Sequence, residues 1–161
     1  MREKLFSIGG DFWITDQDHN KVLLVDGKAL SMRERLELKD ADGNIVATVR
    51  KKLMAMRETM QIDRDGDHAA TVRKELFSPL RHRSVIDLAD GGQLEASGDI
   101  LAKEFEISDG SRALARISRA WFRLRDTYGV DVAPGEDDVL MLAVAVALDR
   151  IHRDEEARRD R

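Results

Sequence analysis

Basic residues recur at matching points of two related segments, and they are the side chains best suited to bind another molecule. The segment ATVRKKLMAMR begins at residue 47, and ATVRKELFSPLR begins at residue 70. A row of Lys and Arg side chains attracts phosphate groups, whether these belong to lipid headgroups or to nucleic acid. The candidate residues for binding an anion or a lipid headgroup are Arg50, Lys51, Lys52, Arg57, Arg73, Lys74, Arg81 and Arg83.

The same cations have a second interpretation, because outward Lys and Arg side chains commonly keep strands soluble. A solvated face therefore stays open as an alternative to a binding surface. Lys51, Lys74 and Arg119 differ from the others, since their positions in the alternating pattern point inward. An inward cation fits a strand end that reaches solvent, a bulge, or an anion-binding ring at the rim of the sheet.

The residue types that commonly bind metals form no recognisable motif in this sequence. No two of the four histidines, at positions 19, 68, 82 and 152, have zinc-motif spacing, so we expect solvated histidines unless the fold brings them together. The stretches DADGN and DRDGD superficially resemble calcium loops, but their glycine is at the fourth position rather than the sixth. We expect hairpin turns there, and no metal or cofactor.

Catalytic motifs are also missing from the sequence. It contains no Gly-x-Ser-x-Gly elbow, no P-loop and no Gly-x-Gly-x-x-Gly. Asp126, Thr127 and Tyr128 fit either a pocket or a strand with its loop, and the acids of GEDD at 135–138 fit a helix start better than a catalytic pair. We therefore expect a protein that is not an enzyme.

The elements that position these residues begin with alternating segments. Ala47 and Val49 share one parity while Thr48 and Arg50 share the other, which is the pattern of a half-buried strand. Turn signals separate such segments, and Asp-Gly pairs favour tight hairpins. They occur as DADGN, DRDGD, LADGG and SDGS, with DQDHN as an earlier form without glycine. This predicts an antiparallel meander of some ten to twelve strands, which tends to curl or close.

An apolar run at 139–148 follows the last alternating segment. It is shorter than the roughly 20 residues that a membrane span needs. Acids precede it and Arg- and Glu-rich sequence follows it, so we expect a helix over about 136–150. A helix that is apolar on all sides must be buried on all sides, and a sheet wrapped around it achieves this. The charged residues 151–161 are expected to form a frayed tail.

Composition sets the class of protein. The 161 residues are 42% apolar with a net charge of -4, which suits one soluble domain over 1–150. The chain has no cysteine and no apolar stretch near its N-terminus, so we expect a cytoplasmic protein. The sequence predicts a mainly β (α+β) fold, with a closed antiparallel barrel around a buried C-terminal helix.

Three segments resemble the LURP-one-related family, within the Tubby C-terminal-like superfamily that also includes phospholipid scramblases. They are KLFSIGGDFWITD at 4–16, VDGKALSMRERLELKDADGN at 25–44 and WFRLRDTYGVDVAPGEDDVLMLAVAVALD at 121–149. The resemblance covers about residues 1–150 and implies a twelve-stranded barrel enclosing a hydrophobic helix. Tubby proteins bind phosphoinositides through a basic surface, but no residue of that site can be matched here. The calcium response of scramblases is not transferred, since no matching acidic segment is recognised.

These observations predict a non-enzymatic binding or scaffold module. Its expected ligand is an anionic phospholipid headgroup, bound peripherally through the basic surface at a membrane. The alternatives are a scramblase-like protein that handles phospholipids, and a protein-interaction module with no small ligand. Nucleic acid is disfavoured by the net charge of -4 and by the lack of a recognised motif. A closed barrel is compatible with a monomer.

Overall fold

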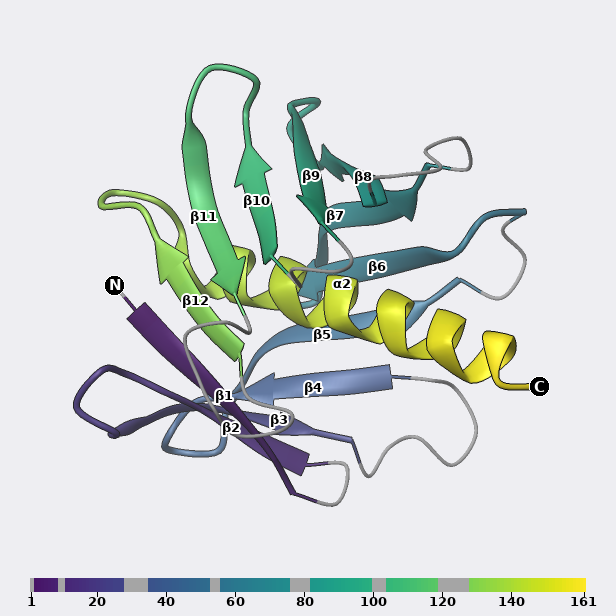
Figure 1. Ribbon diagram of the computed structural model, residues 1–161. Helices are drawn as coiled ribbons and strands as arrows, with labels where there is room; N and C mark the ends of the chain where they lie inside the picture. The colour runs from purple at the N-terminus through teal and green to yellow at the C-terminus, as the bar shows by residue number, and fades with distance from the viewer. Residues whose placement is uncertain are drawn as a thin grey trace.

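Twelve antiparallel strands form one sheet in the computed structural model, which describes residues 2–8, 11–27, 35–52, 56–75, 82–99, 104–118 and 128–161. Each strand pairs with its sequence neighbours, and β1 also pairs with β12, so the sheet closes into a barrel (Figure 1). The strands are β1 (Arg2–Ile8), β2 (Asp11–Thr15), β3 (Lys21–Asp26), β4 (Arg35–Lys39), β5 (Ile45–Lys51), β6 (Thr59–Arg64), β7 (Asp67–Lys74), β8 (His82–Leu88), β9 (Gln93–Asp99), β10 (Glu104–Ser108), β11 (Ala113–Ser118) and β12 (Tyr128–Val132).

The tight turns occur at the predicted Asp-Gly and related signals. Gly43, Gly66, Gly91 and Gly110 all have positive φ, which glycine adopts without the steric penalty of a Cβ. The Asp40 side chain accepts hydrogen bonds from the backbone N–H groups of Asp42 and Asn44, at 3.0 and 2.8 Å. Hairpin turns rather than calcium loops therefore account for these acids.

Helix α2 (Asp138–Arg159) supplies the core of the barrel. Its residues from Met141 to Leu148 are all buried, and the helix packs against β5, β6, β7, β11 and β12. Asp137 caps its first turn, because the carboxylate accepts the N–H of Leu140 at 3.1 Å. Among the described residues, no helix is apolar over a sufficient length to cross a membrane.

The expected end of the helix at about residue 150 requires correction. The helix continues to Arg159, and Ile151 is buried. Charged residues of this last part contact the barrel wall, as the pair between Lys51 Nζ and Asp154 Oδ2 at 2.8 Å shows. The expected frayed tail is therefore ordered helix, because side chains of the wall supply partners for its charges. The mainly β prediction, with one antiparallel sheet and a C-terminal helix, is confirmed.

Candidate functional site

Seven of the eight predicted basic residues lie at one end of neighbouring strands, where the C-terminal part of α2 also ends. They occupy the end of β5, the β5–β6 connection, the end of β7 and the start of β8. We call this set the basic rim: Arg50, Lys51, Lys52, Arg57, Arg73, Lys74 and Arg83. Backbone hydrogen bonds from Lys52 N to Thr59 O and from Lys74 N to Glu58 O, at 2.9 and 3.1 Å, hold these segments together. Arg81 lies outside the described residues, as do Arg119, Asp126 and Thr127.

Three cations of the basic rim point outward and contact acids on adjacent strands. Arg50 lies 3.1 Å from Asp63, and Arg73 contacts Asp87 at 2.6 Å. Arg83 pairs with Glu95. Exposed pairs of this kind contribute little to stability, about 0–1 kcal/mol each. They do reduce the positive charge that these three residues offer to a ligand.

Two cations of the basic rim are exposed without a carboxylate partner among the described residues. Lys52 follows the last residue of β5, and Arg57 lies in the connection to β6 beside the fully exposed Met56. The exposed Arg159 lies at the end of α2, and the neighbouring Arg158 contacts Glu58 at 2.8 Å. Lys52 and Arg57 are thus the members of the rim most available to an external anion.

The two inward cations contact the helix. Lys51 and Lys74 are the last residues of β5 and β7, and their ammonium groups pair with Asp154 and Glu155 of α2. Burial lowers the pKa of Lys74, with further lowering by Arg158 and Arg159, while the charge of Glu58 opposes it. The two lysines lie at strand ends, as in the first of the three predicted explanations, but their ammonium groups contact acids of the chain's own helix rather than reaching solvent alone.

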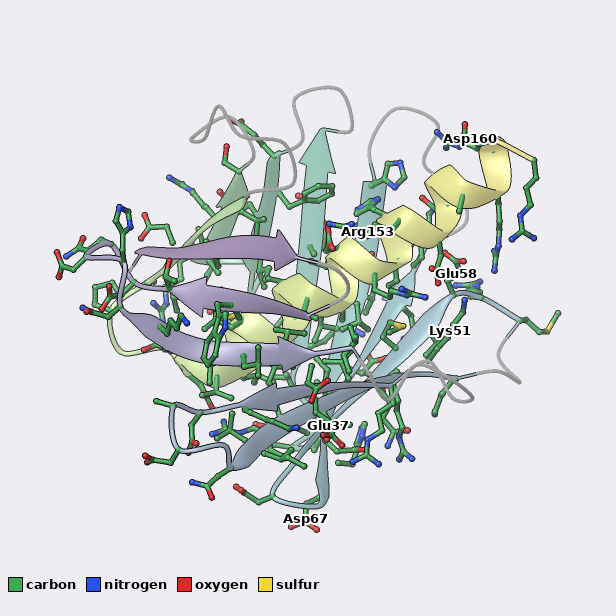
Figure 2. The ribbon with its side chains drawn as sticks, turned by 90° about the horizontal axis from the view of Figure 1, so that it is seen from below. Glu37, Lys51, Glu58, Asp67, Arg153 and Asp160 are labelled. Carbon is green, nitrogen blue, oxygen red and sulfur yellow. The ribbon has the colours of Figure 1, made fainter. Side chains whose placement is uncertain are left out.

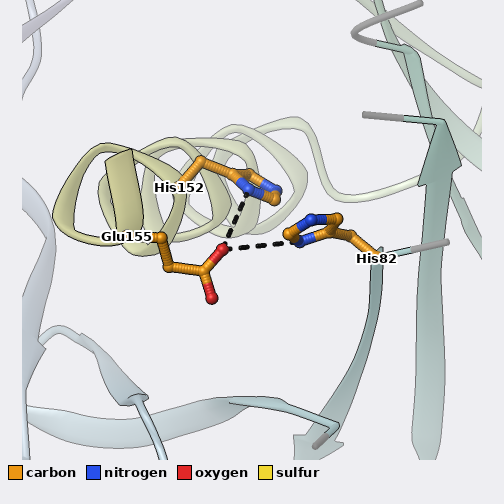
Figure 3. Close-up of side chains that lie close together, drawn as sticks. All are labelled: His82, His152 and Glu155. Atoms are coloured by element: carbon orange, nitrogen blue, oxygen red, sulfur yellow. Dashed lines mark ion pairs between the residues drawn. The ribbon is translucent and has the colours of Figure 1, made fainter. Parts of the chain in front are cut away.

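A histidine pair lies beside Lys74, and sequence reasoning missed it. His82 is the first residue of β8, while His152 and Glu155 lie one turn apart on α2. The Nδ1 atoms of His82 and His152 lie 3.5 and 3.9 Å from Oε2 of Glu155 (Figure 3). His82 shares the inward parity of Ser84 and Ile86, so its strand pattern is the signal that indicates burial.

Electrostatics at His82 favour a neutral imidazole. His82 is only 9% exposed, and its Nδ1 makes no hydrogen bond within the described structure. Burial lowers the pKa of His82, and the positive charges of Lys74 and Arg159 lower it further. A neutral imidazole has a lone pair available to a proton donor or a metal ion. The other two histidines, His19 and His68, are exposed in or beside turns as expected.

Acidic residues collect at the opposite end of the barrel. Five hairpin turns and the link from β12 to α2 share this end, since sequential antiparallel strands alternate in direction. Two of the cations found there are paired with acids, Arg64 with Asp137 and Arg112 with Glu136. The acids of these turns are Asp16, Asp18, Asp40, Asp42, Asp65, Asp67, Asp90 and Asp109. The two ends of the barrel therefore differ in charge, and Figure 2 shows Asp67 far from Lys51 and Glu58.

Comparison with known proteins identifies the family. The chain is 29% identical over 152 residues to the uncharacterized protein YxjI of Bacillus subtilis (strain 168), covering 94% of this chain and 91% of that protein. It is 23% identical over 177 residues to Protein LURP-one-related 15 of Arabidopsis thaliana, covering 98% of this chain and 80% of that protein.

A solved structure shares the fold. An X-ray structure of an Arabidopsis thaliana protein matches with a TM-score of 0.73 and 20% identity, covering 94% of this chain and 90% of the other. The family model described as LURP-one-related matches residues 1–149. The chain therefore belongs to the LURP-one-related family.

Proposed function

We propose that this protein is a non-enzymatic binding module that attaches peripherally to membranes through anionic phospholipid headgroups. The observation that supports this most directly is the exposure of Lys52 and Arg57 without a carboxylate partner among the described residues. Both lie at the end of the barrel that also presents Arg158 and Arg159 of α2. Family membership supports a non-catalytic binding module, since neither curated relative has an enzymatic name.

The distribution of charge favours one orientation on an anionic surface. The whole chain has a net charge of -4, so attraction depends on local arrangement rather than on total charge. Each Lys or Arg near an anionic membrane contributes about 1 kcal/mol, and the effect decays within a Debye length of roughly 8 Å at physiological salt. The basic rim faces the membrane in this orientation, while the acidic turns point away from it.

The apolar residues of the helix take no part in membrane contact in this proposal. Its apolar residues fill the barrel interior and are withheld from lipid. A scramblase-like activity finds no support in the described helix, which is not apolar over a sufficient length to span a bilayer. The alternative function is a protein-interaction module without a small ligand. The following experiment would favour that alternative if the protein does not bind lipid.

Vesicle flotation tests the proposal with charge-neutralised variants. Wild-type protein is expected to float with phosphatidylcholine vesicles that contain phosphatidylserine, and not with phosphatidylcholine alone. The variant K52Q/R57Q loses two exposed cations, so its affinity is expected to fall by about tenfold or more at low salt. The matched control R112Q/R116Q loses two cations that are 57% and 64% exposed elsewhere on the barrel, and it is expected to bind like wild type.

The salt concentration is the second variable of this experiment. Binding that is electrostatic weakens as salt is raised, because exposed charges are screened. Equal flotation of the two double variants would reject the basic rim as the contact surface. Failure of wild-type protein to float with either vesicle at low salt would reject lipid binding and leave the protein-interaction module.

A further inference from the structure

We propose that His82, His152 and Glu155 form a transition-metal site, with Zn²⁺ as the best-fitting ion, that joins strand β8 to helix α2. The three residues come from two elements that are distant in sequence and meet beside Lys74, at the end of the barrel that carries the basic rim. This site is independent of the proposed membrane function, which depends on the exposed cations Lys52 and Arg57.

The spacing of the candidate ligand atoms fits one small ion. One donor atom from each residue can be chosen so that all three lie within 4.8 Å of one another. Oε2 of Glu155 lies 3.5 and 3.9 Å from the Nδ1 atoms of His82 and His152. Zinc bonds of about 2.0–2.1 Å in a tetrahedral arrangement set ligand atoms roughly 3.4 Å apart. Small side-chain shifts therefore bring all three atoms within bonding distance of a common centre.

The helix presents its two ligands in a fixed relation. His152 and Glu155 are three residues apart, so their side chains lie on the same face of α2. The rings of His82 and His152 are 4.7 Å apart between centroids, and the ring of Phe105 lies 4.7 Å from that of His152. The aromatic contact limits the directions in which His152 can turn. A site on two rigid elements needs little rearrangement to bind an ion.

An unpartnered buried nitrogen supports this assignment independently of the distances. Nδ1 of His82 is buried and makes no hydrogen bond among the described residues, although a buried polar atom without a partner costs about 1–3 kcal/mol. It lies 3.5 Å from the Glu155 carboxylate, which is beyond a hydrogen bond but within the span of two ligands of one ion. A bound metal would satisfy this nitrogen.

The surrounding charges determine which metal ions the site can bind. Lys74 pairs with Oε1 of Glu155, which leaves Oε2 directed to the histidines. A hydrogen-bond partner on the second oxygen orients a carboxylate ligand, as outer partners do in known metal sites. The positive charge of Lys74 also opposes a cation, so the site requires an ion with strong intrinsic affinity for imidazole. Zn²⁺ meets this requirement, whereas Mg²⁺ and Ca²⁺ prefer oxygen ligands.

A metal titration of the wild-type protein tests the site directly. Chelator-treated protein is expected to bind one equivalent of Zn²⁺ by calorimetry, and to show no comparable binding of Mg²⁺. The variant H82A/H152A is expected to lose this binding. The control H19A/H68A removes the same number of histidines from exposed turns and is expected to retain it. The affinity of the conservative variant E155Q for Zn²⁺ is expected to be lower than that of wild type by about tenfold or more, because the variant loses a charged ligand.

Histidine NMR resonances provide a measurement that requires no variant. On addition of Zn²⁺, the ring signals of two of the four histidines are expected to shift, and these are His82 and His152. Binding that shifts His19 or His68 instead would overturn the proposal. Equal Zn²⁺ binding by H82A/H152A and wild type, or no Zn²⁺ binding by wild type, would also overturn it.

Discussion

At the scale of single residues, a missing side chain shapes the space around the histidine pair. Gly98 of β9 lies directly opposite His82 on one side and Phe105 on the other. A Cβ at this position would collide with the Phe105 ring and with the carbonyl oxygen of Glu104. The Phe105 ring in turn packs against His152. Gly98 thus lets β10 and its aromatic ring approach the end of the helix closely.

The substitution Gly98→Ala tests this packing. The added methyl group must displace the Phe105 ring or the backbone of β10, so we expect a loss of about 1–3 kcal/mol in the free energy of unfolding. The shift in the urea midpoint at constant m-value measures it. The adjacent Ser97→Ala is the control, and a change within about 0.5 kcal/mol is expected for it. Equal midpoints for the two variants would show that β10 can move to accept the methyl group without a loss in the free energy of unfolding.

Residue types alone predicted the turns but not the partners of buried charges. The Asp-Gly pairs determine local φ values, and this is why Gly43 and Gly66 occur at turns as expected. Lys51 and Lys74 had the inward parity in the sequence, yet their partners Asp154 and Glu155 lie far along the chain. Pairing of this kind depends on how far α2 is inserted into the barrel. His82 and His152 converge for the same reason, so their spacing in the sequence contains no such signal.

At the scale of elements, α2 combines an apolar half with a charged half. The sequence predicts the first half from its apolar composition, and the helix begins next to the acids that were expected to precede it. The second half, from Ile151 onward, resembles a solvated tail in one dimension. In the folded protein its carboxylates contact cations at the ends of β5 and β7. The contribution of this segment to stability is therefore larger than its composition indicates.

Truncation measures that contribution. A chain that stops after Arg150 loses the buried Ile151 side chain, worth about 1.5–3 kcal/mol, and leaves Lys51 and Lys74 without their helical partners. We expect a drop of at least about 2 kcal/mol in the free energy of unfolding, measured by urea denaturation. A chain that stops after Arg159 removes only the two residues beyond the helix and is expected to match wild type. Equal stability of the two truncations would restore the frayed-tail interpretation.

At the scale of the whole molecule, charge is separated along the barrel. The turns at one end contribute acids, and the basic rim with Arg158 and Arg159 contributes cations at the other. The helix is aligned with this arrangement, since its positive N-terminal end lies among acids and its negative C-terminal end lies among cations. We therefore expect a charge dipole that the net value of -4 conceals, although Asp154, Glu155 and Glu58 pair with cations at the basic end.

Ion-exchange chromatography tests this dipole without lipid. A protein with a net charge of -4 is expected to flow through a cation exchanger at pH 7 if its charges are evenly distributed. We expect retention at low salt, because the basic rim can face the resin while the acidic turns face solvent. Earlier elution of K52Q/R57Q than of R112Q/R116Q would locate the contact at the rim. Identical elution of both variants would argue against a localised basic end.

The position of α2 after all the described strands has a consequence for synthesis. The wall of the barrel leaves the ribosome before the helix that fills it, and β1 must wait for β12 before it gains its second neighbour. Until then, side chains such as Val49, Ile62 and Val72 have no helix to cover them. Long-range pairing of this kind slows folding and exposes apolar surface to other chains. A nascent chain of this protein is therefore expected to need protection by chaperones until its last turn of helix has emerged.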